Sequence, residues 1–441
     1  MRLLLICTDP LESKMAGIAI RYTNLANYSS RDFEVTLWAP KVERALAPAV
    51  RVWQGTGGDS GLKAGALDEF DLIVAPPTAI LMFPALLGTS AKVVYDLTDP
   101  IIFENLYLFP GDEARLSAYL ELYQLALWSG HHYLAANERQ RDLWFTILLA
   151  SHRIPAKDLT AEGVMDRYFT TFPTGVPDEA FPMDDGRRTT EARREDPVIL
   201  WSGGAWEWMD PLTPLRAFLE IADRIPHRLV YLGMNHPSGY FPVAKRATEA
   251  ADLAKGDARF ADRIEFHDWI EYERRIEYYR RAAIGISCHP KGLEAYFAYR
   301  TRLLDYFWAG LPVICTEGET LGDLAAARRA ALLVKADDPD DMAEKLLRVL
   351  NDDGLRSKMA AESRAFGESL KWSQTVAALG NRLQSLDYVF PRMENEHVDA
   401  KHKGIDGIFK EINTPWNRVG TVLKREGWGG VARRVKKKLG L

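Results

Sequence analysis

Residues 299–314 read YRTRLLDYFWAGLPVI, and this segment decides the fold class. It opens with charged residues, continues as a short apolar helix pattern, and stops at Gly310-Leu311-Pro312 before an apolar, strand-like ending. The run AIGISCHP at 283–290 precedes it and also has the composition of a buried strand. A strand, a loop, a helix and a second strand in this order predict a parallel sheet covered by helices.

The same alternation extends outward over both halves of the 441-residue chain. The strand-like runs of the first half are RLLLICT, FEVTLWAP, FDLIVAP, KVVYDLTD and HHYLAAN. Those of the second half are VILWSGG, HRLVYLGM, DRIEFHDW, AIGISCHP, LPVICTEG and AALLVKA. A chain of this length exceeds one hydrophobic core, so we predict an α/β protein with two doubly wound domains facing across a cleft.

A Pro- and Gly-rich stretch, TTFPTGVPDEAFP, followed by the polar DDGRRTTEARREDP, marks the predicted boundary between these domains. We expect an N-terminal domain over 1–185 and a C-terminal domain over 186–371. A helical segment follows at 372–388, and the remainder, 389–441, is a basic extension.

Composition narrows the function classes. No apolar run is long enough to span a membrane, and the five apolar residues near the start are too few for a signal peptide. The three cysteines are far apart in apolar runs, which is typical of a reducing compartment, so we expect a cytoplasmic protein. The first 400 residues carry a net charge of −13, which argues against a nucleic-acid-binding protein.

The helix that starts near Arg300 carries the strongest indication of a binding site. Its free backbone N–H groups and positive dipole end, together with Arg300 and Arg302, suit a diphosphate. Asp305 lies one turn further on, where its carboxylate suits the diol of a ribose. The alternative is that both arginines form ordinary ion pairs, with Glu294 or with Asp305.

Other residues after predicted strands add weaker candidates. Gly203 and Gly204 permit close backbone approach to a ligand. Trp206 and Trp208 follow, and they either stack on a base or sugar or pack at the domain edge.

In the first half, Asp96 and Asp99 end a predicted strand, where a carboxylate either orients an acceptor hydroxyl or caps the next helix. No His, Cys or Asp cluster has metal-ligand spacing, so we expect no metal. The loop DPLESKMAGIAI lacks GxGxxG, and the chain has no GxxxxGK[ST], which removes the main support for a dehydrogenase or a P-loop NTPase.

The segment LLDYFWAGLPVI resembles the LLEAMAAGLPVI motif of glycosyltransferase family 4, whose members are retaining enzymes of the GT-B fold. Segments resembling this family continue, in order, over about residues 1 to 385. They are closest to a bacterial subgroup acting on cell-surface polysaccharides. The resemblance implies two Rossmann-like domains and a helix at 372–388 that crosses back to the first domain. It also implies transfer from a nucleotide-sugar donor to a glycan or lipid-linked acceptor, without a cofactor or metal.

The resemblance also assigns residues. Asp305 falls on the acidic residue that holds the donor ribose, and Thr301 and Arg302 fall where backbone amides meet the diphosphate. Gly17 falls on the glycine that lets the acceptor and phosphate approach. Asp96 and Asp99 would lie on the acceptor side of the catalytic cleft.

Two departures from the family pattern leave alternatives open. The usual first acidic residue is replaced by Phe297, and we expect Glu294, eleven positions before Asp305, to contact the sugar as a catalytic residue instead. Gly204 and Met209 stand near the places of the family's Arg and Lys, so Arg300 and Arg302 would supply that charge. The alternatives are a non-catalytic nucleotide-sugar-binding or scaffold relative, and a GT-B nucleotide-sugar epimerase.

The C-terminal tail is basic. From residue 401 onward it has eleven Lys or Arg against three Asp or Glu. Val431, Val435 and Leu439 share one helical face, and Trp428 precedes them. This pattern indicates contact with an anionic membrane surface; the alternative is a solvated or nucleic-acid-binding tail.

Overall fold

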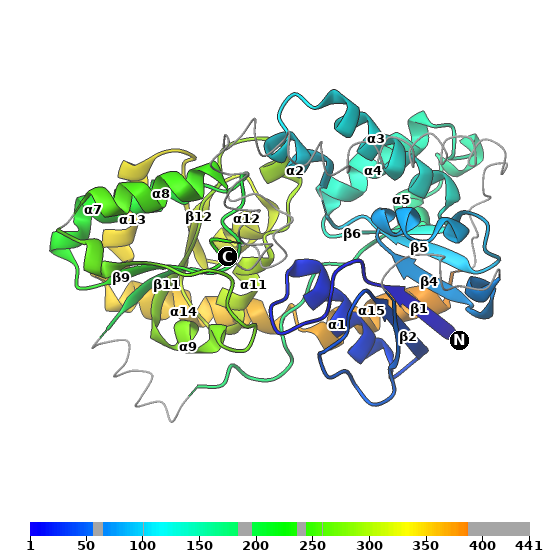
Figure 1. The fold of residues 1–441 in the computed structure, drawn as a ribbon, viewed down its shortest axis with the longest axis horizontal. Helices are drawn as coiled ribbons and strands as arrows, with labels where there is room; N and C mark the ends of the chain where they lie inside the picture. Colours follow the sequence, from blue (N-terminus) through cyan, green and yellow to red (C-terminus); the bar gives the residue numbers. More distant parts are fainter. Residues whose placement is uncertain (56–64, 100, 184–195, 236–243, 258, 387–441) are drawn as a thin grey trace, which may run out of the picture.

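A computed structural model of the chain describes residues 1–55, 65–99, 101–183, 196–235, 244–257 and 259–386. Within these residues the strands form two parallel sheets, one in each half of the chain, and each sheet has helices on both faces (Figure 1). The predicted α/β fold with two doubly wound domains is confirmed. The predicted amphipathic tail lies outside the described residues.

The first sheet has the strand order β3-β2-β1-β4-β5-β6-β7. Its strands are β1 (Arg2–Ile6), β2 (Glu34–Ala39), β3 (Arg51–Gln54), β4 (Leu72–Ala75), β5 (Lys92–Asp96), β6 (His132–Ala135) and β7 (Phe169–Thr171). The order changes direction between β1 and β4, so the loops that follow these two strands meet at a topological switch point.

The second sheet has the order β10-β9-β8-β11-β12-β13 and switches direction between β8 and β11. Its strands are β8 (Val198–Trp201), β9 (Arg228–Tyr231), β10 (Ile264–Phe266), β11 (Ala282–Ser287), β12 (Val313–Thr316) and β13 (Ala331–Val334). The segment 299–314 follows β11, so it begins at this switch point.

Most of the helices connect successive strands, and the last three follow the final strand, β13. Those of the first half are α1 (Gly17–Ser29), α2 (Ile101–Leu108), α3 (Glu113–Ser129), α4 (Glu138–Ala150) and α5 (Val164–Tyr168). Those of the second half are α7 (Leu212–Ile221), α8 (Lys245–Gly256), α9 (Arg275–Arg281), α10 (Leu293–Phe297), α11 (Thr301–Trp308), α12 (Thr320–Ala327), α13 (Pro339–Leu350), α14 (Asp353–Glu368) and α15 (Trp372–Gln384). No described helix is both long enough and apolar enough to cross a bilayer.

Alternate side chains of each strand enter different cores. In β1, Leu4 and Ile6 pack with helices α3 and α4, whereas Leu3 and Leu5 pack with α1 and α15. In β8, Trp201 packs toward α7 and α13, and Leu200 toward α11. Each fully buried side chain of this kind contributes about 1.5–3 kcal/mol. Burial on both faces explains why the strands read as continuous apolar runs.

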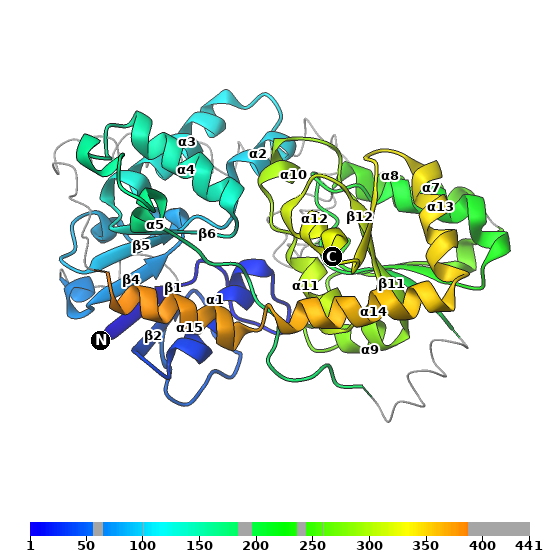
Figure 2. The ribbon, with the colours of Figure 1, turned by 180° about the vertical axis from the view of Figure 1, so that it is seen from behind.

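The two halves are joined by two chain segments that lie side by side. The end of α14 leads into α15, which leaves the second half and packs on α1 of the first (Figure 2). Beside this crossing, Val176 N–H donates to Leu370 O (2.9 Å) and Trp372 N–H donates to Val176 O (3.0 Å). Gly175 lacks a side chain where a Cβ would come within 2.9 Å of Leu370 O, so the two segments pack backbone against backbone.

The elements that were not predicted include β3, β7 and α2. The strand β3 has no buried residue and lacks a strong apolar run. The strand β7 ends inside TTFPTG, which we interpreted as linker, and helix α2 follows KVVYDLTD as an apolar stretch without a polar face. A short strand or an apolar helix has too weak a periodicity to be distinguished from a loop or a buried strand.

Candidate active site

Two helix N-termini face each other between the halves. A Cβ added at Gly17, the first residue of α1, would lie 3.8 Å from Thr301 Oγ1, at the first residue of α11. Neither helix has a side chain that caps its N-terminus. Both therefore direct unpaired N–H groups and a positive dipole end toward the same space, which suits an anion such as a diphosphate.

Arg302 lies beside this space and is only partly engaged. Its guanidinium lies 4.5 Å from the ring centroid of Trp201, and Nη2 donates to Gly204 O at 2.5 Å. Its Nη1 is buried and has no hydrogen-bond partner among the described residues. Burial lowers the pKa of Arg302 to about 10, which still leaves it charged at neutral pH. Arg302 thus retains an unused donor for an anionic ligand.

The glycine loop after β8 is shaped by backbone packing. Gly203 has a φ of 91°, and a Cβ at Gly233, which has a φ of 81°, would come within 2.9 Å of the Gly203 carbonyl carbon. A Cβ at Gly204 would clash with the indole ring of Trp206. Side chains at Gly204 and Gly233 would therefore displace the loop.

Trp206 forms part of an aromatic cluster next to the loop. Its ring stacks on Trp208 at 5.3 Å with an interplanar angle of 7°, and it meets Trp269 at 5.8 Å. Trp269 Nε1 donates to Met15 O in the first half at 3.1 Å. Of our two interpretations, packing at the domain edge describes Trp208, which is buried, whereas Trp206 is half-buried and keeps an accessible surface.

Arg300 and Glu294 have a different arrangement from the one we expected. Glu294 is 1% exposed and accepts hydrogen bonds from Nη1 and Nη2 of Arg300. The ion pair that we considered as the alternative is therefore present for Arg300, with the carboxylate turned away from solvent. Their predicted contacts with the diphosphate and the sugar remain predictions that require this pair to open.

The carboxylate of Asp305 is held by two side chains of α9. It accepts hydrogen bonds from Arg275 Nε (3.1 Å) and from the Tyr279 hydroxyl (2.9 Å). Its side chain is 23% exposed, so part of the carboxylate is reachable by a ligand. The two donors fix its orientation, and its predicted contact with a ribose remains a prediction.

The two candidate aspartates of the first half, Asp96 and Asp99, have different surroundings. Asp96 is 4% exposed and forms a bidentate ion pair with Arg21, at 2.7 and 3.1 Å. Thr98 Oγ1 donates to the same carboxylate. These three donors occupy the Asp96 carboxylate, so we interpret Asp96 as a residue that fixes the end of the strand. Asp99 is therefore the better placed of our two candidates for direct contact with an acceptor.

Asp99 belongs to a group of carboxylates that we did not recognise in the sequence. Burial, with the nearby charge of Asp9, raises the pKa of Asp99 to about 7. Burial and Asp99 raise the pKa of Glu104, on α2, well above its usual value. The feature of the sequence that could have revealed Glu104 is its position as a single carboxylate inside the apolar run IIFENLYL. Perturbed carboxyl groups in an interdomain site are candidates for proton transfer.

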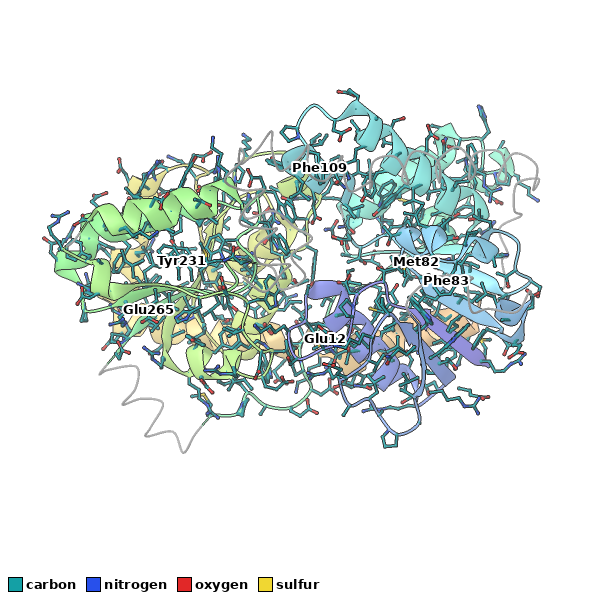
Figure 3. All side chains as sticks on the ribbon, viewed as in Figure 1. Glu12, Met82, Phe83, Phe109, Tyr231 and Glu265 are labelled. Atoms are coloured by element: carbon teal, nitrogen blue, oxygen red, sulfur yellow. The ribbon has the colours of Figure 1, made fainter. Side chains whose placement is uncertain are left out.

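Helix α2 brings this group against the second half. Phe103 stacks on Phe297 with ring centroids 4.9 Å apart, and Gln140 Nε2 donates to Phe297 O at 2.8 Å. Leu108 is buried in the core of the second half, and Phe109, labelled in Figure 3, packs against the same core. Phe297, which replaces the acidic residue of the family pattern, thus forms part of the contact between the halves.

No group of three or more potential ligands for a metal ion occurs in the part of the chain that the structure describes. The expectation that no metal is required is not tested by this and stays a prediction. The positive charge at the site comes instead from helix N-termini and arginines, which can stabilise a leaving diphosphate.

Comparisons with known proteins agree with this arrangement. Residues 196–352 match the family model described as Glycosyl transferases group 1. No curated protein matches the chain. The sucrose-phosphate synthase of Thermosynechococcus elongatus is 16% identical, with an alignment over 87% of this chain and 98% of that one and a TM-score of 0.62.

Two further structures are similar. Alr3699/HepE from Anabaena, solved in complex with UDP and glucose, is 11% identical over 87% of this chain and 99% of that one, with a TM-score of 0.60. A putative UDP-N-acetylglucosamine 2-epimerase from Listeria monocytogenes is 12% identical over 89% and 99%, with a TM-score of 0.51. At these identities the likeness shows the fold, which is GT-B. The family match over the second half supports a glycosyltransferase.

Proposed function

We propose that this protein is a retaining glycosyltransferase that moves a sugar from a nucleotide-sugar donor to a glycan or lipid-linked acceptor. The observation that carries the proposal is the approach of Gly17 to Thr301, which places two helix N-termini around one space, with Arg302 beside it. A nucleoside diphosphate is the ligand chemistry that this arrangement suits. The presence of UDP and glucose in the complex of the Anabaena neighbour agrees with such a donor.

In this proposal the second half holds the donor. The diphosphate lies at the N-terminus of α11 with Arg302, and the exposed part of Asp305 accepts hydrogen bonds from the ribose. Trp206, half-buried beside Gly204, borders the nucleotide. Glu294 reaches the sugar once the diphosphate has taken its place at Arg300.

In this reaction the negatively charged diphosphate of the donor serves as both the leaving group and the base. The bond between the anomeric carbon and the diphosphate oxygen breaks, and a new bond to the acceptor oxygen forms on the same face. The acceptor proton passes to the leaving phosphate oxygen, so no strong protein base is required. Asp99, with its pKa near 7, orients the acceptor hydroxyl.

One observation favours a second function. Glu294, the residue expected to contact the sugar, is sequestered by Arg300, and Phe297, which replaces the family's acidic residue, is stacked on Phe103. A non-catalytic nucleotide-sugar-binding relative would tolerate this arrangement. An epimerase is the third possibility, because the Listeria structure has the same fold.

The experiment that separates these functions begins with a thermal-shift panel of UDP-, GDP-, ADP- and dTDP-sugars. The sugar nucleotide that stabilises the protein is then incubated with it and with candidate acceptors, and the products are analysed by NMR. Transfer with retained anomeric configuration supports the proposal. Binding without transfer or hydrolysis supports the non-catalytic relative, and a changed configuration at another sugar carbon supports the epimerase.

A further inference from the structure

A groove of about 800 Å³ lies outside the interdomain site, at the edge of the first sheet. It is lined by β7, by α5 with the preceding Gly163, and by the end of α15 at Arg382, Ser385 and Leu386. The last described residue of the chain, Leu386, is therefore part of its wall. The groove shares no residue with the site formed around Gly17 and Thr301.

The strand β7 is paired on one side only among the described residues, with β6. Phe172 N–H donates to Ala135 O of β6 at 2.8 Å. Because successive backbone groups of a strand point in opposite directions, the N–H and C=O of Thr171 point away from β6, and Thr171 lines the groove. Phe169 N–H is already used by Met165 O. The groove thus presents the open backbone edge of β7, which favours pairing with another strand.

The chain continues from Leu386 with Asp387-Tyr388-Val389-Phe390-Pro391. Tyr, Val and Phe favour strands, and a proline ends strand pairing because it has no N–H. The three residues match the length of β7. Tyr388 is two residues, or about 7 Å of extended chain, from the groove wall at Leu386. Such a short tether gives this segment a large advantage in effective concentration over any external strand.

The charges at the groove agree with this occupant. Arg382 Nη2 donates to the carbonyl oxygens of Asp166 and Arg167, and Arg382 has no carboxylate partner in the described part of the chain. Residues 387–400 contain four Asp or Glu and one Arg. The groove lining carries Arg167 and Arg382 against one carboxylate, Asp166, so a net negative segment is complementary to it.

We propose that residues 388–390 add to the first sheet as a strand beside β7. The C-terminal extension is then attached to the first half of the molecule, and Pro391 is the point from which the rest of the extension departs. This inference does not depend on the proposed glycosyltransferase activity.

Hydrogen exchange on the full-length protein tests the proposal. Adjacent N–H groups of a strand point to opposite sides, so either Tyr388 or Val389 donates to β7, and Tyr388→Pro and Val389→Pro are both made. Deuterium uptake in peptides covering residues 168–172 should accelerate about tenfold or more in at least one of the two variants. Val398→Pro, in the same extension, is the matched control and should leave uptake unchanged. Unchanged uptake in both test variants overturns the proposal.

A second measurement identifies the origin of the added strand. If the strand comes from the same chain, the wild type, Tyr388→Pro and Val389→Pro all have the mass of a monomer by size-exclusion chromatography with light scattering. A wild-type dimer that either Tyr388→Pro or Val389→Pro converts to a monomer would show that the strand comes from a second copy, and would overturn the proposed occupant.

Discussion

Arg300 and Glu294 form a bidentate ion pair, with Nη1–Oε1 and Nη2–Oε2 distances of 2.8 and 2.5 Å. Their side chains are 7% and 1% exposed, so the pair is almost completely removed from water. Replacing both partners of such a buried ion pair changes the stability little. Replacing only one leaves an uncompensated buried charge, which lowers the stability strongly. The loss of one partner should therefore be measurable as a loss of stability.

Removing Arg300 should destabilise the protein. Arg300→Ala leaves a buried carboxylate without a partner, and we expect a loss of about 3–5 kcal/mol in the free energy of unfolding. Urea denaturation measures this loss. The double variant Arg300→Met with Glu294→Gln is the control and should lose less. A single variant as stable as the wild type would show that Glu294 finds another donor.

Removing Arg302 should weaken nucleotide binding instead. Its unpartnered Nη1 is available for a charge-assisted contact worth about 1.5–3 kcal/mol, so Arg302→Ala should lower the affinity for a nucleoside diphosphate about tenfold or more. Isothermal calorimetry gives the affinity. Arg274→Ala, at a side chain 58% exposed on the same half, is the matched control. Equal affinity in both variants would remove Arg302 from the donor site.

Asp305 should distinguish a ribose from a deoxyribose. Its partly exposed carboxylate can accept from a 2′-hydroxyl, so the wild type should bind the 2′-deoxy nucleotide less tightly. Asp305→Asn should bind the ribonucleotide less tightly and lose this preference. The comparison is made by calorimetry with both nucleotides. A wild type that binds both equally would leave Asp305 with only its structural contacts to Arg275 and Tyr279.

Asp99 should make stability depend on pH. Its pKa is raised from 3.8 to about 7, so the folded protein holds this proton more tightly than the unfolded chain. The stabilisation is complete below about pH 4 and is lost as the pH rises through about 7, with a slope of up to about 1.4 kcal/mol per pH unit. Urea denaturation at several pH values should give a shallower decline for Asp99→Asn.

Glu43→Gln, at a side chain 56% exposed, is the control for this titration and should follow the wild-type profile. Identical profiles for the wild type and Asp99→Asn would mean that Asp99 titrates alike in the folded and unfolded chain.

The C-terminal tail should bind anionic membranes. From Lys424 to Leu441 it carries seven basic residues and one acidic residue, each basic residue contributing about 1 kcal/mol near an anionic surface. Truncation after Pro415 should abolish sedimentation with phosphatidylglycerol vesicles and leave donor binding in solution intact. Full-length protein that ignores these vesicles at low salt would contradict the membrane interpretation.

The sequence was informative wherever a local pattern determines the structure. The strands that are buried on both faces, such as β1 and β8, were predicted because their apolar runs are continuous. The start of α11 at Thr301 was anticipated from the charged residues that precede an apolar helix. These features depend on neighbours in the chain.

The partners of individual side chains could not be predicted in the same way. The pairing of Asp96 with Arg21 spans 75 positions, and the stacking of Phe297 on Phe103 requires the two halves to be placed against each other. For Arg300 the local pattern allowed both a ligand and an ion pair with Glu294. Burial, which only the three-dimensional structure supplies, decides between them.

The backbone bonds between Val176 and the segment Leu370–Trp372 have a mechanical consequence. If the two crossings were far apart, they would resist rotation of one half against the other about every axis except the line that joins them. Because the two crossings are joined at one place, they act as one pivot. Separation of the two halves is then a rotation in which the displacement of an element grows with its distance from that pivot. Helix α2 lies away from the junction of α14 and α15, where this pivot is (Figure 2), so a small change of angle at the pivot moves α2 relative to the second half further than it moves the start of α15.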